Sequence, residues 1–206
     1  MKIYFFFAVL LSVYSARCQT SVEKTIVGAH IDFIEIDATN CFDIILETST
    51  APEMHIVARI DGEYHKDLGL KVKEQGNTLQ LGAGFQPNFN KPNDKLSAHK
   101  VISIALKIRL PEGKSVVLNG TSCNVSAKGA YRNLEVSLND GFCFLQQISE
   151  NVTVRTQSGD IIIESNTATI KAESKYGKVG KNKIPKGDNR YVLKTITGNI
   201  RFSKTE

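Results

Sequence analysis

The chain has 206 residues, of which 41% are hydrophobic and 23% charged. This composition excludes a disordered or fibrous chain, and the length is enough for one sizeable core or two small ones. The formal net charge of +5 falls to +3 when the two basic residues among the first eighteen are set aside. A net positive charge this small gives no strong indication of nucleic-acid binding.

The first eighteen residues have the layout of a secretory signal peptide. Met1-Lys2 is a short basic start, residues 3–13 (IYFFFAVLLSV) are apolar, and Ala16-Arg17-Cys18 brings small residues before a cut. We therefore expect cleavage between Cys18 and Gln19, with export to the periplasm, the outer membrane or the cell exterior. A lipoprotein would keep Cys18 as a lipidated first residue, but the arginine before it does not fit such a signal. No later stretch approaches eighteen apolar residues, so we expect no membrane span in the mature chain.

The part from about residue 25 to 110 is predicted to form short β-strands. Apolar and polar side chains alternate in five segments. Gln75-Gly76-Asn77 between two of them is typical of a hairpin turn, and Pro111-Glu112-Gly113 ends the last one. No window shows a capped apolar stripe of helical period, so helix is a minor component at most. The five segments are residues 31–37, 53–60, 68–73, 78–81 and 102–110.

The second half, from about residue 111 to 203, contains a repeat. Each unit is a short alternating strand, a polar turn with glycine and another short strand. A unit this small cannot bury its own apolar face, so it must stack on its neighbours. A meander of hairpins and a parallel β-solenoid both satisfy this need, and the repeat length favours the solenoid. The turn glycines are Gly120, Gly141, Gly159, Gly177 and Gly198, with gaps of 21, 18, 18 and 21 residues.

The clearest units, residues 156–161 (TQSGDI) and 195–200 (TITGNI), resemble the adhesin-head families, the GIN-type domains of secreted Bacteroidetes proteins. Residues 42–46 (FDIIL) and 55–58 (HIVA) extend this resemblance, which covers about residues 25–203. It implies a right-handed parallel β-helix with antiparallel strands in the N-terminal part, as one domain over residues 19–206. The sequence departs from the family at 178–190, an insertion, and at Asn139-Asp140-Gly141. The family has no agreed biochemical activity.

Clustered carboxylates would indicate a glycosidase, a polysaccharide lyase or a Ca²⁺ site. Asp140 and Asp160, with Glu164 nearby, could stack at neighbouring turns, but aspartate also favours turns through hydrogen bonds to its own backbone. Cys41 lacks the orienting partner that a nucleophile needs, and is expected to be a buried thiol within an apolar strand. We therefore expect no enzyme, and no catalytic, cofactor-binding or metal-binding residues. The histidines, which lack metal-ligand spacing, are His30, His55, His65 and His99.

Cys123 and Cys143 are twenty residues apart, close to one repeat, so they are expected on adjacent coils. Free stacked thiols and a disulfide both fit this spacing. The sequence therefore does not decide whether Cys123 and Cys143 form a disulfide.

Two segments could serve binding. Residues 82–100 form a long irregular stretch with Phe85 and Phe89, which either contacts a ligand or covers the end of the core. Residues 171–194 carry eight lysines and arginines against two acids, a local charge of +6. Such charges either attract anionic polymers or protect an exposed sheet edge against aggregation. We expect these residues to protect a sheet edge.

These observations predict an exported, non-enzymatic surface or envelope protein. It would be an adhesin-like or scaffolding module that acts through the surface of its β-solenoid. The alternative is a carbohydrate-active β-helix enzyme or a glycan-binding protein. The expected partner is a glycan or an envelope component, and not a nucleic acid.

Overall fold

The computed structural model describes residues 19–62, 66–86, 89 and 102–204. The predicted signal peptide lies outside these residues, as does most of the predicted binding loop at 82–100. All of the regular secondary structure among the described residues is β-strand, which confirms the all-β class. The same residues hold no helix with the length and apolarity needed to cross a membrane.

The described residues form fourteen strands, which belong to one continuous sheet. Their bounds are β1 Gln19–Val27, β2 Phe33–Asp37, β3 Asp43–Ser49, β4 Glu53–Gly62, β5 Leu68–Gln75, β6 Thr78–Phe85, β7 Ile102–Pro111, β8 Ser115–Ser122, β9 Asn124–Asp140, β10 Phe142–Thr156, β11 Asp160–Glu164, β12 Thr169–Ser174, β13 Arg190–Thr195 and β14 Ile200–Ser203.

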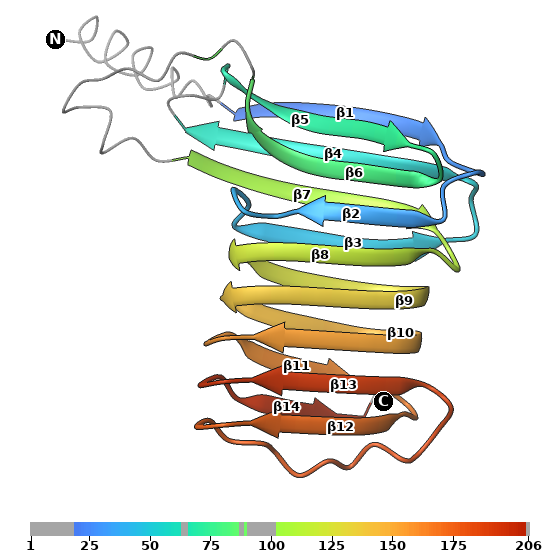
Figure 1. Cartoon of the computed structure of the whole chain (residues 1–206), viewed down its shortest axis with the longest axis vertical. Coiled ribbons are helices and arrows are strands. Elements are labelled where there is room, and N and C mark those ends of the chain that lie inside the picture. Colours follow the sequence, from blue (N-terminus) through green and yellow to red (C-terminus); the bar gives the residue numbers. More distant parts are fainter. Residues whose placement is uncertain (1–18, 63–65, 87–88, 90–101, 205–206) are drawn as a thin grey trace, which may run out of the picture.

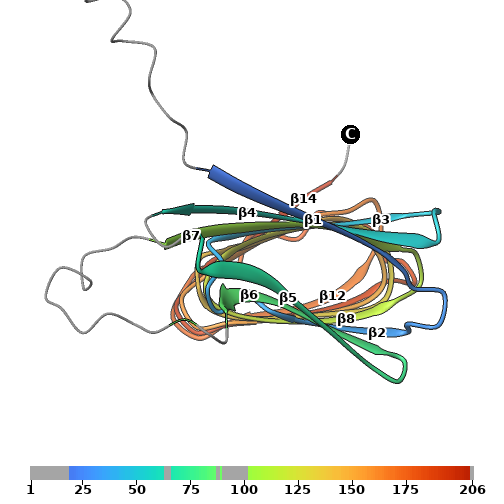
Figure 2. The same ribbon diagram turned by 90° about the horizontal axis from the view of Figure 1, so that it is seen from above.

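The sheet folds over into two facing layers because β9 and β10 bend midway. The first half of β9 pairs with β3, and its second half pairs with β8. We call the two layers the front sheet and the rear sheet, after their positions in Figure 1. Seen from above, the layers form a flattened ring (Figure 2). In space the front sheet runs β5, β6, β2, β8, β9, β10, β13, β12, and the rear sheet runs β1, β4, β7, β3, β9, β10, β11, β14.

Strand direction changes along the stack. The N-terminal pairs β1–β4, β4–β7 and β5–β6 are antiparallel, as expected. From the repeat region onward the pairing is parallel, and Phe142–Gln146 of β10 runs parallel to Asp160–Glu164 of β11. The prediction that successive repeats pair in parallel is therefore confirmed, and a hairpin meander is excluded for this half.

The core lies between the two sheets and is supplied by every second residue. In β7, the inward-facing Ile104, Leu106, Ile108 and Leu110 are at most 1% exposed. Burying one such side chain contributes about 1.5–3 kcal/mol, so this layer of apolar contacts is the main source of stability. Because the side-chain period is two, the alternate residues point outward and align in columns across the parallel strands.

One corner of the stack is a ladder of glycines, which explains the spacing of the last four turn glycines, from Gly141 to Gly198; Gly120 lies outside it, because a Cβ there would meet only side chains. A Cβ on Gly159 would lie 2.9 Å from the carbonyl oxygen of Gly141. A Cβ on Gly198 would overlap the carbonyl oxygen of Gly159, and one on Gly177 would overlap that of Gly198. Only glycine allows the backbones to approach this closely at each turn.

The last layers are not in chain order. β13 lies between β10 and β12, although β12 precedes it in the sequence. Val179 forms a parallel bridge to Ile200 of β14, so the chain also passes beyond β14 before it returns. The segment predicted as an insertion, 178–190, is thus part of the outermost layer and the connection back from it. Its Ile184 is buried at the end of the core.

Two predictions need correction. The strand predicted over residues 78–81 continues to Phe85, because Ala83 still faces the core, so the irregular segment begins four residues later than predicted. Cys41 does not lie in an apolar strand. Its N–H donates to the Ala38 carbonyl in the turn between β2 and β3, where the side chain is nevertheless buried.

A candidate ligand-binding groove beside the hairpin

A hollow lies on the outer surface of the front sheet, beside the hairpin of β5 and β6. Its volume is about 600 Å³. Strand register sets its outward side chains in two columns, because aligned residues of neighbouring strands face the same side. We call it the hairpin groove. Its columns are Lys71, Gly82, Asp37 and Asn119, and Lys73, Gln80, Glu35 and Val117.

Gly82 creates the space in the middle of the groove. It is aligned with Asp37 in β2 and Lys71 in β5 but has no side chain to fill the gap. A Cβ placed on Gly82 would make only ordinary contacts, 3.4 Å from Cβ and 3.5 Å from the carbonyl oxygen of Asp37. Since a glycine weakens a strand and is not needed here for backbone packing, its effect is to keep the groove open.

The two carboxylates of the groove are each fixed through one oxygen. Gln80 Nε2 donates to Glu35 Oε2 at 2.9 Å. Asp37 Oδ1 accepts from the Thr39 N–H at 3.0 Å and from Thr39 Oγ1 at 2.6 Å. The other oxygen of each carboxylate has no protein partner among the described residues and can accept hydrogen bonds from a ligand.

Lys71 and Lys73 lie on the opposite wall, on β5. Neither forms an ion pair within the part of the chain that the structure describes. The groove therefore offers acceptors on β2 and charged donors on β5, with Gly82 and Gln80 of β6 between them and the aliphatic Val117 of β8 beyond the carboxylates. Such a surface suits a ligand with many hydroxyl groups, which both donate and accept.

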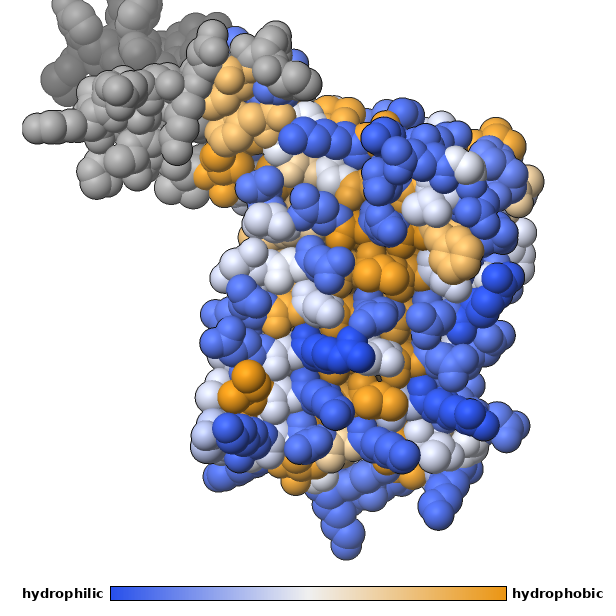
Figure 3. Space-filling view, viewed as in Figure 1, coloured by the Kyte–Doolittle hydropathy of each residue, from blue (hydrophilic) through white to orange (hydrophobic). Residues whose placement is uncertain are grey.

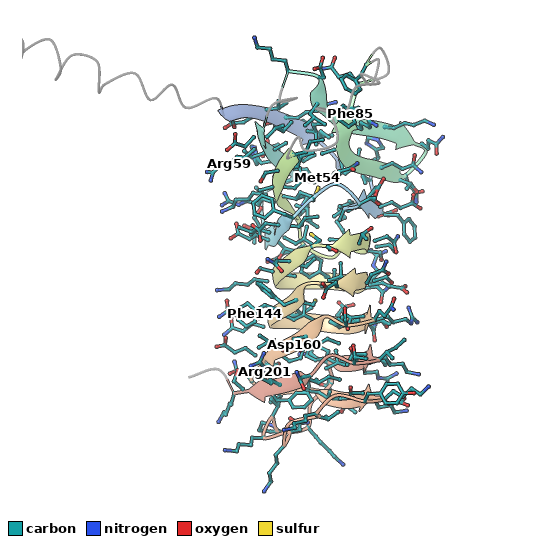
Figure 4. All side chains as sticks on the ribbon, turned by 90° about the vertical axis from the view of Figure 1, so that its left-hand side faces the viewer. Met54, Arg59, Phe85, Phe144, Asp160 and Arg201 are labelled. Carbon is teal, nitrogen blue, oxygen red and sulfur yellow. The ribbon has the colours of Figure 1, made fainter. Side chains whose placement is uncertain are left out.

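The aspartates considered for catalysis are not brought together. Asp160 is aligned with Phe142, not with Asp140. Its Oδ2 accepts from Arg201 Nη2 at 2.6 Å, and its Oδ1 accepts from the N–H of Asn199 at 2.8 Å (Figure 4). Asp140 Oδ1 instead accepts from Ser158 Oγ at 3.0 Å. Both aspartates therefore bind residues of neighbouring layers, rather than the backbone of their own turn as predicted.

The histidines do not converge either. His30 Nε2 lies 3.7 Å from Glu74, and His55 Nδ1 lies 3.1 Å from Thr25 Oγ1 on a different strand pair. His65 and His99 fall outside the described residues. Within the described ranges no three histidine, cysteine or acidic side chains are placed to share a metal ion.

Of the four cysteines in the sequence, the three that lie in described residues, Cys41, Cys123 and Cys143, are free and buried at one corner. Burial raises the pKa of each thiol to about 12, because the thiolate would lose its hydration. The spacing of Cys123 and Cys143 thus corresponds to free thiols in this structure, and a nucleophilic role for Cys41 has no support.

The basic stretch lies at the end of the stack opposite the hairpin groove. The lysines of this stretch are exposed, namely Lys171 on β12 and Lys175, Lys178, Lys181, Lys183 and Lys186 on the segment that follows. β12 pairs only with β13 among the described strands, so its outer edge is open beside these charges.

The other candidate segment, residues 82–100, is described only in part. Its Phe85 packs against the core, and the Phe85 ring stacks on Phe89 with centroids 4.2 Å apart. These contacts favour the interpretation that the two rings cover the end of the core.

Sequence reasoning missed the groove itself. The available signal was Gly82, a glycine at an outward position directly after an alternating strand. The sequence pattern places Gly82 at the start of the irregular segment 82–100, because the strand register that aligns it with Asp37 depends on contacts between distant segments. Figure 3 shows the front face, where an apolar column runs along the stack between polar side chains.

Comparison with known proteins gives a similarity in fold alone. No family model matches the chain, and no curated protein matches it. Among solved structures, a putative cell adhesion protein from Clostridium sporogenes superposes with a TM-score of 0.60 at 14% identity, over 90% of this chain and 100% of that one. A putative adhesin from Bacteroides fragilis covers 89% of this chain and 97% of its own, at 14% identity and a TM-score of 0.40.

Proposed function

We propose that this chain is an exported, non-enzymatic binding protein of the adhesin type. In this proposal a right-handed β-solenoid presents the hairpin groove to a hydroxyl-rich ligand, a glycan of the cell envelope or of a surface. The observation that carries it is the hollow at Gly82, lined by carboxylates on one wall and lysines on the other. The signal-peptide layout of residues 1–18 supports export, and the fold shared with a protein named for cell adhesion supports the adhesin class.

The alternative, a glycan-cleaving enzyme, has less support. A glycosidase needs one carboxyl group that keeps its proton as a general acid, which requires apolar burial. Glu35 and Asp37 are both exposed to solvent. Asp160 forms an ion pair with Arg201 at the edge of the rear sheet. The arrangement favours holding a ligand over transforming it.

A substitution that fills the groove tests the proposal. Gly82→Val places a branched side chain between Lys71 and Asp37, where β-strand geometry tolerates it. Purified wild type and variant would be applied to an array of neutral and acidic glycans. We expect wild type to bind at least one class, and Gly82→Val to lose at least about tenfold in affinity.

Ser137→Val is the matched control. Ser137 is aligned with Asn119, one strand beyond the groove, and its side chain also faces outward. Both variants should unfold within about 1 kcal/mol of wild type, since valine suits an outward strand position. Equal binding by wild type and Gly82→Val, or equal losses in Gly82→Val and Ser137→Val, would show that the groove is not the ligand site.

A further inference from the structure

A second hollow lies on the rear sheet, on the opposite side of the molecule from the hairpin groove. It has a volume of about 130 Å³ and opens over the short side chain of Ser126 in β9. Ile45 of β3 and Phe144 of β10 are aligned with Ser126 on either side. With strands about 4.8 Å apart, these two apolar side chains stand about 10 Å from each other across the hydroxyl. We call this the Phe144 hollow.

Three polar side chains form one rim of the hollow: Glu47, Lys128 and Gln146. They are also aligned with one another across the same three strands. Phe144 projects from the same side of the stack as the Asp160–Arg201 ion pair (Figure 4). The hollow therefore has an aromatic wall, an aliphatic wall, a hydroxyl floor and a polar rim.

Two of the three rim side chains, Glu47 and Gln146, are held in place by contacts outside the hollow. Glu47 Oε2 lies 3.2 Å from Lys107 Nζ and 3.5 Å from Arg109 Nη2, which leaves Oε1 able to accept. Gln146 Nε2 donates to Glu164 Oε2 at 3.3 Å, which leaves the amide oxygen able to accept. Lys128 has no ion pair among the described residues and can donate.

This combination fits one class of ligand. A pyranose ring has an apolar C–H face, which packs on an aromatic side chain, and a rim of hydroxyl groups that both donate and accept. A protein partner would instead bury Glu47 and Lys128 near the centre of its contact, although charged groups are depleted there because of their desolvation cost. We propose that the Phe144 hollow is a subsite for one pyranose ring of a polysaccharide, separate from the hairpin groove.

Affinity electrophoresis of the purified chain tests this, in native gels containing laminarin, xylan, mannan, polygalacturonate or hyaluronan. We expect at least one neutral polysaccharide to retard the wild type. Phe144→Ala, which removes the ring, and Ser126→Leu, which fills the floor, should each weaken binding at least about tenfold. Phe144→Trp should retain it, because the larger ring still offers a flat face.

Two control variants separate this site from the rest of the surface. Val192→Ala removes an outward aliphatic group from the front sheet, and Gly82→Val fills the hairpin groove. Both should keep the Phe144-dependent retardation, so failure of one site leaves the result for the other intact.

Four outcomes would overturn the proposal. The first is unchanged retardation in Phe144→Ala, and the second is that none of the five polysaccharides retards the wild type. The third is retardation by the acidic polymers alone that disappears in salt, which would assign binding to the lysines. The fourth is a change of oligomeric state in Phe144→Ala during gel filtration, which would make the hollow an interface between copies of this chain.

Discussion

The carbonyl oxygen of Gly159 occupies the space where a side chain of Gly198 would begin. These residues are 39 positions apart in the sequence, yet they are neighbours in the glycine ladder. The ladder ties each repeat to the next through backbone contact rather than through side chains. Its members should therefore tolerate substitution much less well than a glycine in an ordinary turn.

Gly198→Ala should lower the free energy of unfolding by about 3 kcal/mol, because the added methyl group forces two backbones apart. Gly76, at the tip of the β5–β6 hairpin, has a φ of 61°, and a Cβ there would meet no atom within 4 Å. Gly76→Asn should cost less than about 1 kcal/mol, since asparagine tolerates this conformation. Urea unfolding followed by circular dichroism measures both. Similar losses in the two variants would contradict the role assigned to the ladder.

The hydroxyl of Thr195 should contribute measurably to stability. Its Oγ1 accepts from the buried Gly198 N–H at 3.1 Å. Thr195→Val keeps the shape but leaves that donor without a partner, at a cost of about 1–3 kcal/mol. Thr153→Val, at an outward position of β10, should change stability by less than about 0.5 kcal/mol. Thermal unfolding of the pair distinguishes a hydrogen-bonding role from a general intolerance to valine.

The buried thiols predict a loss of stability in alkali. Burial raises the pKa of Cys41, Cys123 and Cys143 from 9.0 to about 12. Between these values the unfolded chain releases protons that the folded chain retains, so the free energy of unfolding should fall as the pH rises from 9 to 12. The contribution is fully present below pH 9. Cys143→Ala should show a shallower decline in a series of melting temperatures, and an equal or steeper one would exclude this cause.

The same thiols should resist alkylation in the folded protein. Iodoacetamide at pH 8 reacts with thiolates, and a buried thiol is both protonated and enclosed. We expect no labelling of the folded chain at Cys41, Cys123 or Cys143 and full labelling in urea, as measured by mass spectrometry. Rapid labelling of any of the three without denaturant would show that its corner of the core opens readily.

The basic end of the stack is expected to protect the open edge of β12. Weak retention on heparin, lost at or below physiological salt of about 0.15 M, should accompany such dispersed charges. Replacing Lys181, Lys183 and Lys186 with serine should increase concentration-dependent association in light scattering, because the edge loses its repulsion. Strong heparin retention that the triple substitution abolishes would instead assign a polyanion site to this end.

Much of the fold follows from local patterns. Alternation predicts the strands, and the glycine spacing predicts parallel stacking because a single unit cannot bury its apolar face. The altered unit at Asn139–Gly141 also has a physical reason: Leu138 stands where later repeats place a hydroxyl, such as Thr156, whose Oγ1 donates to the Gly159 carbonyl at 2.6 Å. The hydroxyl contacts thus begin one layer later than the glycine ladder.

The order of the last layers could not be predicted. Ser174 and Thr195 each accept from the N–H of a glycine three residues on, so the two units have the same local structure. What separates them is burial. Tyr191 and Leu193 of β13 fill the interior layer, whereas Ile170 and Ala172 of β12 are only partly buried at the end. The Phe144 hollow could not be predicted from the sequence either, because it depends on the alignment of three strands, β3, β9 and β10.

The interleaved order of β12 and β13 has a consequence for how the protein assembles. Residues 169–174 and residues 151–156 of β10 are aligned with the same residues of β13, Arg190–Thr195. We therefore expect β12 to pair with β10 temporarily until β13 displaces it. Refolding would then end with an exchange of one strand for another rather than with the addition of a strand to a free edge. We expect a slow final refolding phase that disappears when residues 190–206 are deleted, and stopped-flow measurements that find a single phase in both chains would exclude such an exchange.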